Sequence, residues 1–335
     1  MQIDSKVSAS NHKLKWKLLL EKLSEDNPNF IISAGDQIDF EYSIISEIPA
    51  VGEADFIEKF KPGLLRHLPF APAIGNHDVD PPDDSNSNKT IAFTTNNPFR
   101  WHYKLPNELN YNVTEYNINA GNYYFRINNV LFVALNTRYT SAVSTLPARW
   151  ENCLSSAKAA NTGQYDWIVV FHHIPTINIG MYSTGGGGGE NNINRINIYK
   201  VGFEAMMDKH GVDFVLAGHE HIYARSHAIK TNKEIQNQLP NGGSVHNAGG
   251  TVYMTANTAS GIKYYSINLQ SEPYIAVSDH RTLSNTSPGM YILFEVNGKS
   301  FNAKAYYIAP GGSAGSPNFN NSTKTMLDSF TLTKS

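Results

Sequence analysis

Several short apolar runs, each the length of a buried β-strand, constrain the fold more than any other feature of this sequence. They are rich in β-branched and aromatic side chains and are too short to be core helices. The runs occupy residues 30–33, 70–74, 130–135, 167–171 and 214–217. Helical patterns lie between some of them, and this alternation predicts an α/β core in which at least some strands pair in parallel.

The clearest helix signal covers residues 12–26, where leucines recur at helical spacing before Pro28 ends the pattern. Residues 54–68 and 198–211 carry further helical patterns. Gly211 is suited to the end of the second, because glycine readily adopts the left-handed conformation of a helix C-cap.

The chain after about residue 245 has a different pattern, rich in Tyr, Val and Thr with turn residues between apolar segments. Segments 246–260, 291–299 and 301–309 look like strands. The simplest architecture is a single domain over residues 1–335 with a β-rich C-terminal part.

Composition excludes several classes of function. The net charge is −2, so no basic patch argues for nucleic acid, and no apolar run is long enough to span a bilayer. The single cysteine, Cys153, cannot form an internal disulfide or a thiolate-rich metal site, and we expect it to be buried in a helix. The N-terminus has no apolar segment typical of a signal peptide.

Polar residues with metal-binding or acid–base side chains follow the apolar runs directly. They are Asp36, then Asn76, His77 and Asp78, then His172 and His173, and finally His219 and His221. Each taken alone could be a helix cap or a turn residue. Together they predict a site, because ligands in open α/β sheets bind at the carboxyl ends of the strands. The alternation expected of an extended segment would point His219 and His221 at one object, which suggests a metal.

The blocks GDQID, GNHD, FHH and GHEH, in that order, resemble the signature of the calcineurin-like metallophosphoesterases. The longer stretches GHEHIYAR and GTVYMTANTASGIKYY are closest to the purple acid phosphatase-like branch. The resemblance runs from about residue 4 to about 310. It implies a four-layer α/β/β/α sandwich with two metal ions, Fe, Zn or Mn, in a cleft at the strand ends.

Metal ligands follow from the resemblance, position by position. Asp36 would bridge both ions, and the remaining ligands would be Asn76, His172 and His219 for one ion and Asp4 and His221 for the other. His77 would act on the phosphoryl group as acid or stabiliser, and Asp78 would orient it. Candidate substrate contacts are His173, Tyr182 and Arg225.

The implied activity is the hydrolysis of a small phosphoester, with a monoester favoured over a diester. Carboxylate, amide and imidazole ligands suit these ions, and a paired site lowers the pKa of a bridging water so that hydroxide attacks phosphorus. A nucleotide or cyclic-nucleotide hydrolase is an alternative, because aromatic residues around Trp101 could stack on a base. The oligomeric state stays open.

Two departures favour another alternative, a degenerate member that binds a ligand or partner without turnover. Only three residues precede Asp4, so the first strand of the family is almost absent, and Lys6 stands where many relatives have a metal ligand. A second histidine of the branch is missing near Met181 and Tyr182. Either the first metal site is weakened or upstream residues are missing, and in the second case we expect an exported or extracellular protein.

Overall fold

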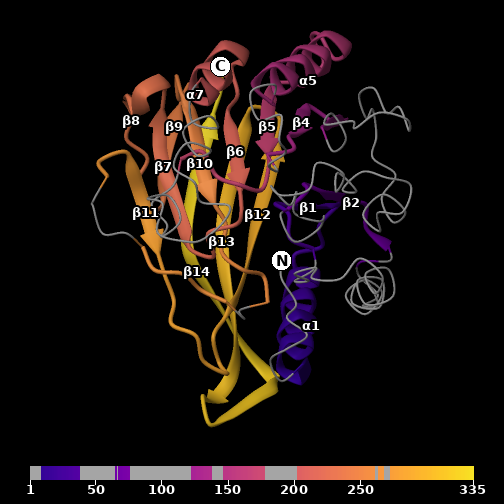
Figure 1. Cartoon of the computed structure of the whole chain (residues 1–335), viewed down its shortest axis with the longest axis vertical. Helices are drawn as coiled ribbons and strands as arrows, with labels where there is room; N and C mark the ends of the chain where they lie inside the picture. The colour runs from indigo at the N-terminus through magenta and orange to yellow at the C-terminus, as the bar shows by residue number, and fades with distance from the viewer. Residues whose placement is uncertain are drawn as a thin grey trace, which may run out of the picture.

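The computed structural model of the protein describes residues 9–37, 65, 67–75, 122–137, 146–177, 202–260, 263–267 and 272–335. Within these ranges the chain forms layers of helices and sheets (Figure 1). No helix in the described ranges is long and apolar enough to cross a membrane.

An eight-stranded mixed sheet lies at the centre of the fold, with the order β11-β7-β10-β6-β5-β4-β3 and with β8 paired to β7. Its strands are β3 (Tyr123–Ile127), β4 (Val130–Ala134), β5 (Trp167–Phe171), β6 (Phe214–Ala217), β7 (Tyr223–Ile229), β8 (Ile235–Asn237), β10 (Thr251–Thr255) and β11 (Ile275–Asp279). Neighbours from β4 through β5 and β6 to β10 pair in parallel, and the other pairs are antiparallel. The predicted parallel core is therefore confirmed.

The second β layer consists of two separate sheets. One has the order β12-β13-β14-β9, and the other is the parallel pair β1-β2. Their strands are β1 (Ile31–Ser33), β2 (Phe70–Pro72), β9 (Gly243–His246), β12 (Gly289–Asn297), β13 (Ser300–Ser313) and β14 (Ser316–Thr333). The expected β-rich C-terminal part is present, but the sequence analysis did not predict β14.

Helices cover both outer faces. The helix α5 (Leu146–Ala160) and the helix α7 (Phe203–His210) pack against one face of the large sheet, and α1 (Ala9–Glu25) packs against β12 and β13. Between the two β layers lies the largest apolar cluster, which joins Phe132, Phe214 and Phe301. The layers are therefore α/β/β/α, as the resemblance implied.

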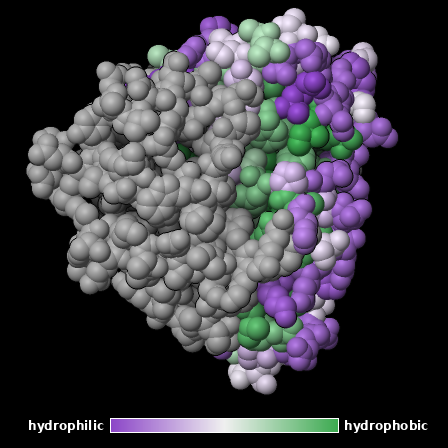
Figure 2. All heavy atoms as spheres, turned by 90° about the vertical axis from the view of Figure 1, so that its right-hand side faces the viewer, coloured by the Kyte–Doolittle hydropathy of each residue, from purple (hydrophilic) through white to green (hydrophobic). Residues whose placement is uncertain are grey.

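The central strands are buried on both faces, so their side chains alternate between two cores. Along β5, Val169 and Phe171 face the second β layer, whereas Ile168 and Val170 face α5 and α7. Such two-sided burial explains why these strands read as continuous apolar runs. On the face that Figure 2 shows, hydrophobic residues also gather in a band, with hydrophilic residues along its right-hand side.

The helix predictions hold in part. Helix α1 spans the segment predicted before Pro28 and begins a little earlier, at Ala9. Helix α7 lies within its predicted segment, of which residues 198–201 are outside the described residues, and Gly211 follows it as the C-cap with φ 66° and ψ 42°. The helix expected over residues 54–68 lies mostly outside the described residues.

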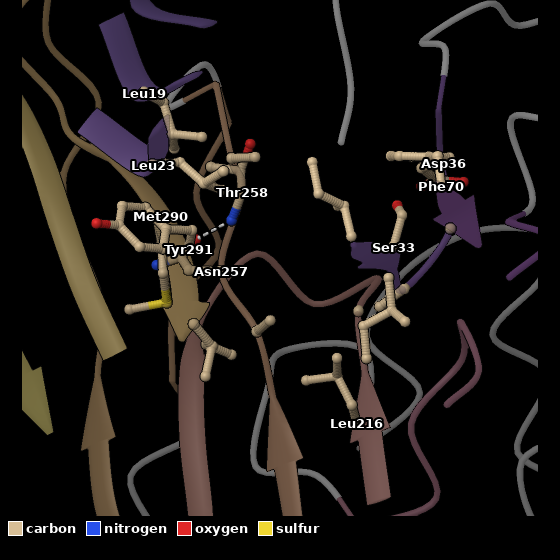
Figure 3. Close-up of a pocket in the computed structure, with 18 of the residues that line it drawn as sticks. Leu19, Leu23, Ser33, Asp36, Phe70, Leu216, Asn257, Thr258, Met290 and Tyr291 are labelled. Carbon is tan, nitrogen blue, oxygen red and sulfur yellow. Dashed lines mark hydrogen bonds between the residues drawn. The ribbon is translucent and has the colours of Figure 1, made fainter. Parts of the chain in front are cut away.

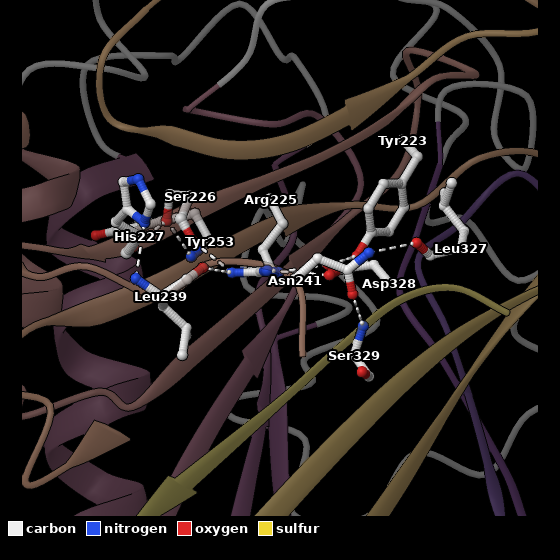
Figure 4. A network of polar contacts seen from close by, with 10 residues as sticks. All are labelled: Tyr223, Arg225, Ser226, His227, Leu239, Asn241, Tyr253, Leu327, Asp328 and Ser329. Carbon is white, nitrogen blue, oxygen red and sulfur yellow. Dashed lines mark hydrogen bonds and ion pairs between the residues drawn. The ribbon is translucent and has the colours of Figure 1, made fainter. Parts of the chain in front are cut away.

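A buried polar network joins the two β layers (Figure 4). Arg225 of β7 donates from Nε and Nη2 to the two carboxylate oxygens of Asp328 on β14, at 2.5 and 3.0 Å. Tyr223 donates to the same carboxylate at 2.6 Å, and Nη1 of Arg225 donates to the carbonyl of Leu239 at 2.8 Å. The guanidinium also lies 4.8 Å from the ring centre of Phe330. These hydrogen bonds and the ring contact thus offset the free-energy cost of burying the Arg225 and Asp328 charges.

Replacing Asp328 by alanine should destabilise the protein strongly, because it leaves the Arg225 guanidinium buried without its counter-ion. We expect a loss of about 3–5 kcal/mol in the free energy of unfolding, measured by urea denaturation. The matched control is Glu295→Gln, which breaks an exposed pair with Lys304 and should cost about 0–1 kcal/mol. Equal effects of the two substitutions would contradict the assigned role of the network.

The only cysteine should be unreactive while the protein is folded. Cys153 is fully buried in α5, and burial raises the pKa of its thiol to about 12, so almost no reactive thiolate forms at neutral pH. Mass spectrometry after iodoacetamide treatment at pH 8 should detect no alkylation without denaturant and complete alkylation in guanidinium. Rapid labelling of the folded protein would show that α5 opens readily.

Candidate metal centre

The loops that follow β1 and β6 pass close to each other, and this brings the strand ends of the two β layers together. Gly35 follows β1 with φ 93°, and a Cβ there would lie 2.6 Å from Nδ1 of His173. Gly218 follows β6, and a Cβ there would lie 2.9 Å from the carbonyl oxygen of Ala34. Both positions therefore require glycine, because any larger residue would push the loops apart.

The backbone at the centre is left-handed, not extended. Asp36, His219 and His221 have φ of 52°, 72° and 46°. The extended conformation expected for His219 and His221 is therefore wrong, although both side chains line one cavity, as predicted. A left-handed non-glycine residue costs on the order of 1–3 kcal/mol and persists where the surroundings enforce it, commonly at functional sites.

Asp36, His173 and His219 form a compact cluster of metal-binding side chains, with their ligand atoms all within 4.8 Å of one another. Oδ2 of Asp36 lies 3.1 Å from Nε2 of His173, and that nitrogen lies 3.2 Å from Nδ1 of His219. Asp36 and His173 are both buried. The cluster thus gathers a carboxylate and two imidazoles from three strand ends, those of β1, β5 and β6.

A backbone carbonyl fixes the orientation of His173. Its Nδ1 lies 2.7 Å from the carbonyl oxygen of Ala34, which can only accept a hydrogen bond. With the proton on Nδ1, Nε2 presents a lone pair toward Asp36 and His219. A histidine whose second nitrogen is held by a carbonyl is typical of a metal ligand, because that hydrogen bond sets the tautomer and raises ligand basicity.

His221 repeats this arrangement beside the cluster. Its Nδ1 lies 3.1 Å from the carbonyl oxygen of Lys263, and its ring stacks on Tyr265 at 4.9 Å. Burial holds the pKa of His221 well below its ordinary range, and the nearby Asp36 carboxylate offsets this only in part. The ring is therefore neutral near pH 7 and lines the same cavity as the cluster.

His172 lies apart from the cluster, although the sequence analysis assigned it to the metal and left His173 to the substrate. Its ring is fully buried and packs edge-on against Phe203 of α7, with ring centres 5.2 Å apart. Burial lowers the pKa of His172 to about 3, and neither ring nitrogen has a hydrogen-bond partner among the described residues. Adjacent residues at a strand end point to opposite faces, so only one of the pair can join Asp36.

Arg225 is not a substrate contact in this structure. It is 0% exposed, and its donors are engaged in the network between the β layers. The remaining predicted site residues lie outside the described residues: Asp4, Asn76, His77, Asp78 and Tyr182.

The donor set fits a metal ion. One carboxylate and neutral imidazoles suit Zn, Mn and Fe ions, and the fixed tautomer of His173 turns an acceptor nitrogen toward a carboxylate oxygen. Two acceptors at this distance repel each other unless a cation or a proton lies between them. Asp36, His173 and His219 would therefore hold the ion, and His221 is placed to contribute at the edge.

A sequence profile described as calcineurin-like phosphoesterase matches residues 12–223, which is most of the chain. The chain belongs to the calcineurin-like phosphoesterase family. This confirms the resemblance drawn from the signature blocks. No curated protein matches the sequence significantly.

Solved structures share the fold of this chain at low sequence identity. A purple acid phosphatase from yellow lupin (Lupinus luteus) seeds has a TM-score of 0.62 and 12% identity, over 97% of this chain and 49% of the lupin chain. PhoD has a TM-score of 0.60 and 12% identity, over 96% of this chain and 66% of that one. GAP50, the anchor in the inner membrane complex of Plasmodium, has a TM-score of 0.52 and 12% identity, over 98% and 87%. The chain thus spans about half of the lupin enzyme and about two thirds of PhoD.

The roles of His172 and His173 in the structure differ from those predicted, and alanine variants test this difference directly. His173→Ala should weaken metal binding by more than about 100-fold, because it removes a ligand, whereas loss of a group that only hydrogen-bonds a ligand costs about 10–100-fold in affinity. The variant should therefore lose its metal on dialysis. His172→Ala should retain the metal and instead lower stability, because it leaves a cavity beside Phe203. Elemental analysis and urea denaturation of both variants measure these effects. Metal loss confined to His172→Ala would contradict the observed placement.

Proposed function

We propose that the protein hydrolyses small phosphomonoesters with the help of metal ions held at the Asp36–His173–His219 cluster. The observation that supports this most is the pairing of Asp36 with His173. A carboxylate oxygen and the lone-pair nitrogen of a tautomer-locked imidazole lie 3.1 Å apart in a buried pocket at the strand ends. Family membership supports phosphoester hydrolysis as the reaction class.

In this proposal the described residues act mainly by holding the metal ions and by orienting the histidine rings that bind them. Ala34 and Lys263 supply the carbonyls that accept from Nδ1 of His173 and His221, so each ring keeps Nε2 free of a proton. Burial keeps His221 neutral, and a neutral imidazole is the form that binds a cation. Metal ions, when bound, supply water activation near neutral pH and neutralise charge on the phosphoryl oxygens.

The remaining roles in the proposal fall on residues outside the described ranges. Asn76 and Asp4 would complete the ligand set of a dinuclear centre, and His77, oriented by Asp78, would donate to the leaving oxygen. A centre with two ions is proposed because Asp36 can bridge and because His221 lines the cavity outside the compact cluster.

Activity on a generic aryl phosphate should depend on metal and on the cluster. We expect EDTA treatment to abolish hydrolysis and added Mn²⁺ or Zn²⁺ to restore it. His219→Ala should lower kcat/KM at least about 100-fold, because it removes a ligand from the centre. His246→Ala, a change at an exposed histidine bonded to Thr333, is the matched control and should leave activity unchanged.

A bis-aryl phosphate diester, assayed beside the monoester, tests the substrate class. A higher kcat/KM for the diester would reject the monoester preference while keeping phosphoester hydrolysis. Metal-loaded protein inactive on both esters, with His219→Ala showing reduced metal content, would favour the binding protein without turnover.

A further inference from the structure

Residues 263–265 pack against His221, the histidine at the edge of the candidate metal centre. They belong to the stretch GTVYMTANTASGIKYY, which resembles the purple acid phosphatase-like branch and in which the sequence analysis identified no site residue. Asp36 and His221 both line the cavity that Figure 3 shows. Contacts that fix His221 therefore act on a side chain of the centre itself.

Two contacts fix the His221 ring from different directions. At the ring edge, the carbonyl oxygen of Lys263 lies 3.1 Å from Nδ1 and can only accept a hydrogen bond. On the ring face, Tyr265 stacks with ring centres 4.9 Å apart and an angle of 19° between the planes. The edge contact alone would let the ring tilt, and the face contact alone would let it flip. Together they hold one tautomer in one orientation, with Nε2 free of a proton.

The Tyr265 ring is itself held in place on several sides. It packs in a small apolar cluster with Ile222, which precedes β7, and with Ala224 of β7, and both of these are buried. The ammonium of Lys263 lies 5.3 Å from the centre of the Tyr265 ring, within the range of a cation–π contact. The backbone N–H of Tyr265 also donates to the carbonyl of His221 at 3.4 Å. Because the tyrosine ring has these supports, it restrains the imidazole instead of moving with it.

We propose that Tyr265 is a positioning residue that sets how tightly the centre binds the ion at His221. The proposal rests on the proposed dinuclear centre, in which His221 serves the ion outside the compact cluster. That ion has a single histidine ligand, so the orientation of this one ring matters more to it than to the ion at His173 and His219. Loss of a group that holds a ligand costs about 10–100-fold in metal affinity. Loss of the stack alone falls at the lower end of this range, because the carbonyl of Lys263 stays in place.

Titration calorimetry with Zn²⁺ on the metal-free protein tests the proposal without any measurement of turnover. Tyr265→Leu should weaken the binding of the weaker ion about tenfold, because the stack is lost. The stronger ion should bind as it does in the parent protein. Tyr265→Phe keeps the aromatic face and should bind both ions as the parent does.

Ile267→Ala is the matched control for loss of packing. Ile267 packs against the same apolar cluster as Tyr265, but it has no ring that could stack on His221. The substitution should lower the Tm, because it leaves a cavity beside Ile222 and Ala224, and it should leave the affinity for both ions unchanged.

Nitrogen-15 NMR of the metal-free protein reports the tautomer of His221 directly. We expect a single form protonated on Nδ1 in the parent and a mixture of both tautomers in Tyr265→Leu. This result depends neither on hydrolysis nor on the number of ions bound. A parent protein that binds one ion would overturn the dinuclear centre, and the tautomer of His221 would then decide the role of Tyr265.

Three outcomes would overturn the role of Tyr265. The first is a Tyr265→Leu variant with the single tautomer and the ion affinities of the parent. The second is a Tyr265→Phe variant as impaired as Tyr265→Leu, and the third is equal weakening of both ions.

Discussion

Burial of the central strands on both faces is the constraint on which the rest of the structure depends. Strands β4, β5 and β6 have no exposed side chain, so every residue must go to one of two cores. One core lies between the two β layers, whereas the other lies against α5 and α7. A shift of one residue in any of these strands would exchange all of these partners at once.

The same alternation extends past the strand ends into the metal centre. Phe171 faces the second β layer, and two residues later His173 faces it too, beside Asp36 from β1. His172 follows Val170 to the helical side and meets Phe203. The chemistry at the end of β5 is thus set by the packing of the strand itself.

The strands, the layers and the family could be predicted from the sequence because apolar runs and signature blocks are local patterns. The choice between His172 and His173 could not be made by pattern alone, since it needs the knowledge of which face of β5 carries the helices. Once that face was known, counting two residues forward from Phe171 would have identified His173. Arg225 was predicted to contact substrate because it follows the GHEH block. Its structural role could not be predicted, because its partner Asp328 lies far along the chain on β14. Strand β14 was missed because its first part is polar and largely exposed, with regular apolar burial only near its end.

The pairing of Arg225 with Asp328 has a consequence for how relatives of this protein can diverge. Either residue changed alone leaves a charge stranded between two sheets, whereas both changed together to apolar residues of similar volume leave none. The Tyr223 hydroxyl donates to Asp328, and the Leu239 carbonyl accepts from Arg225. A double substitution would leave both of these groups without their partners. Positions 225 and 328 should therefore covary across homologues, although they are 103 residues apart in the chain.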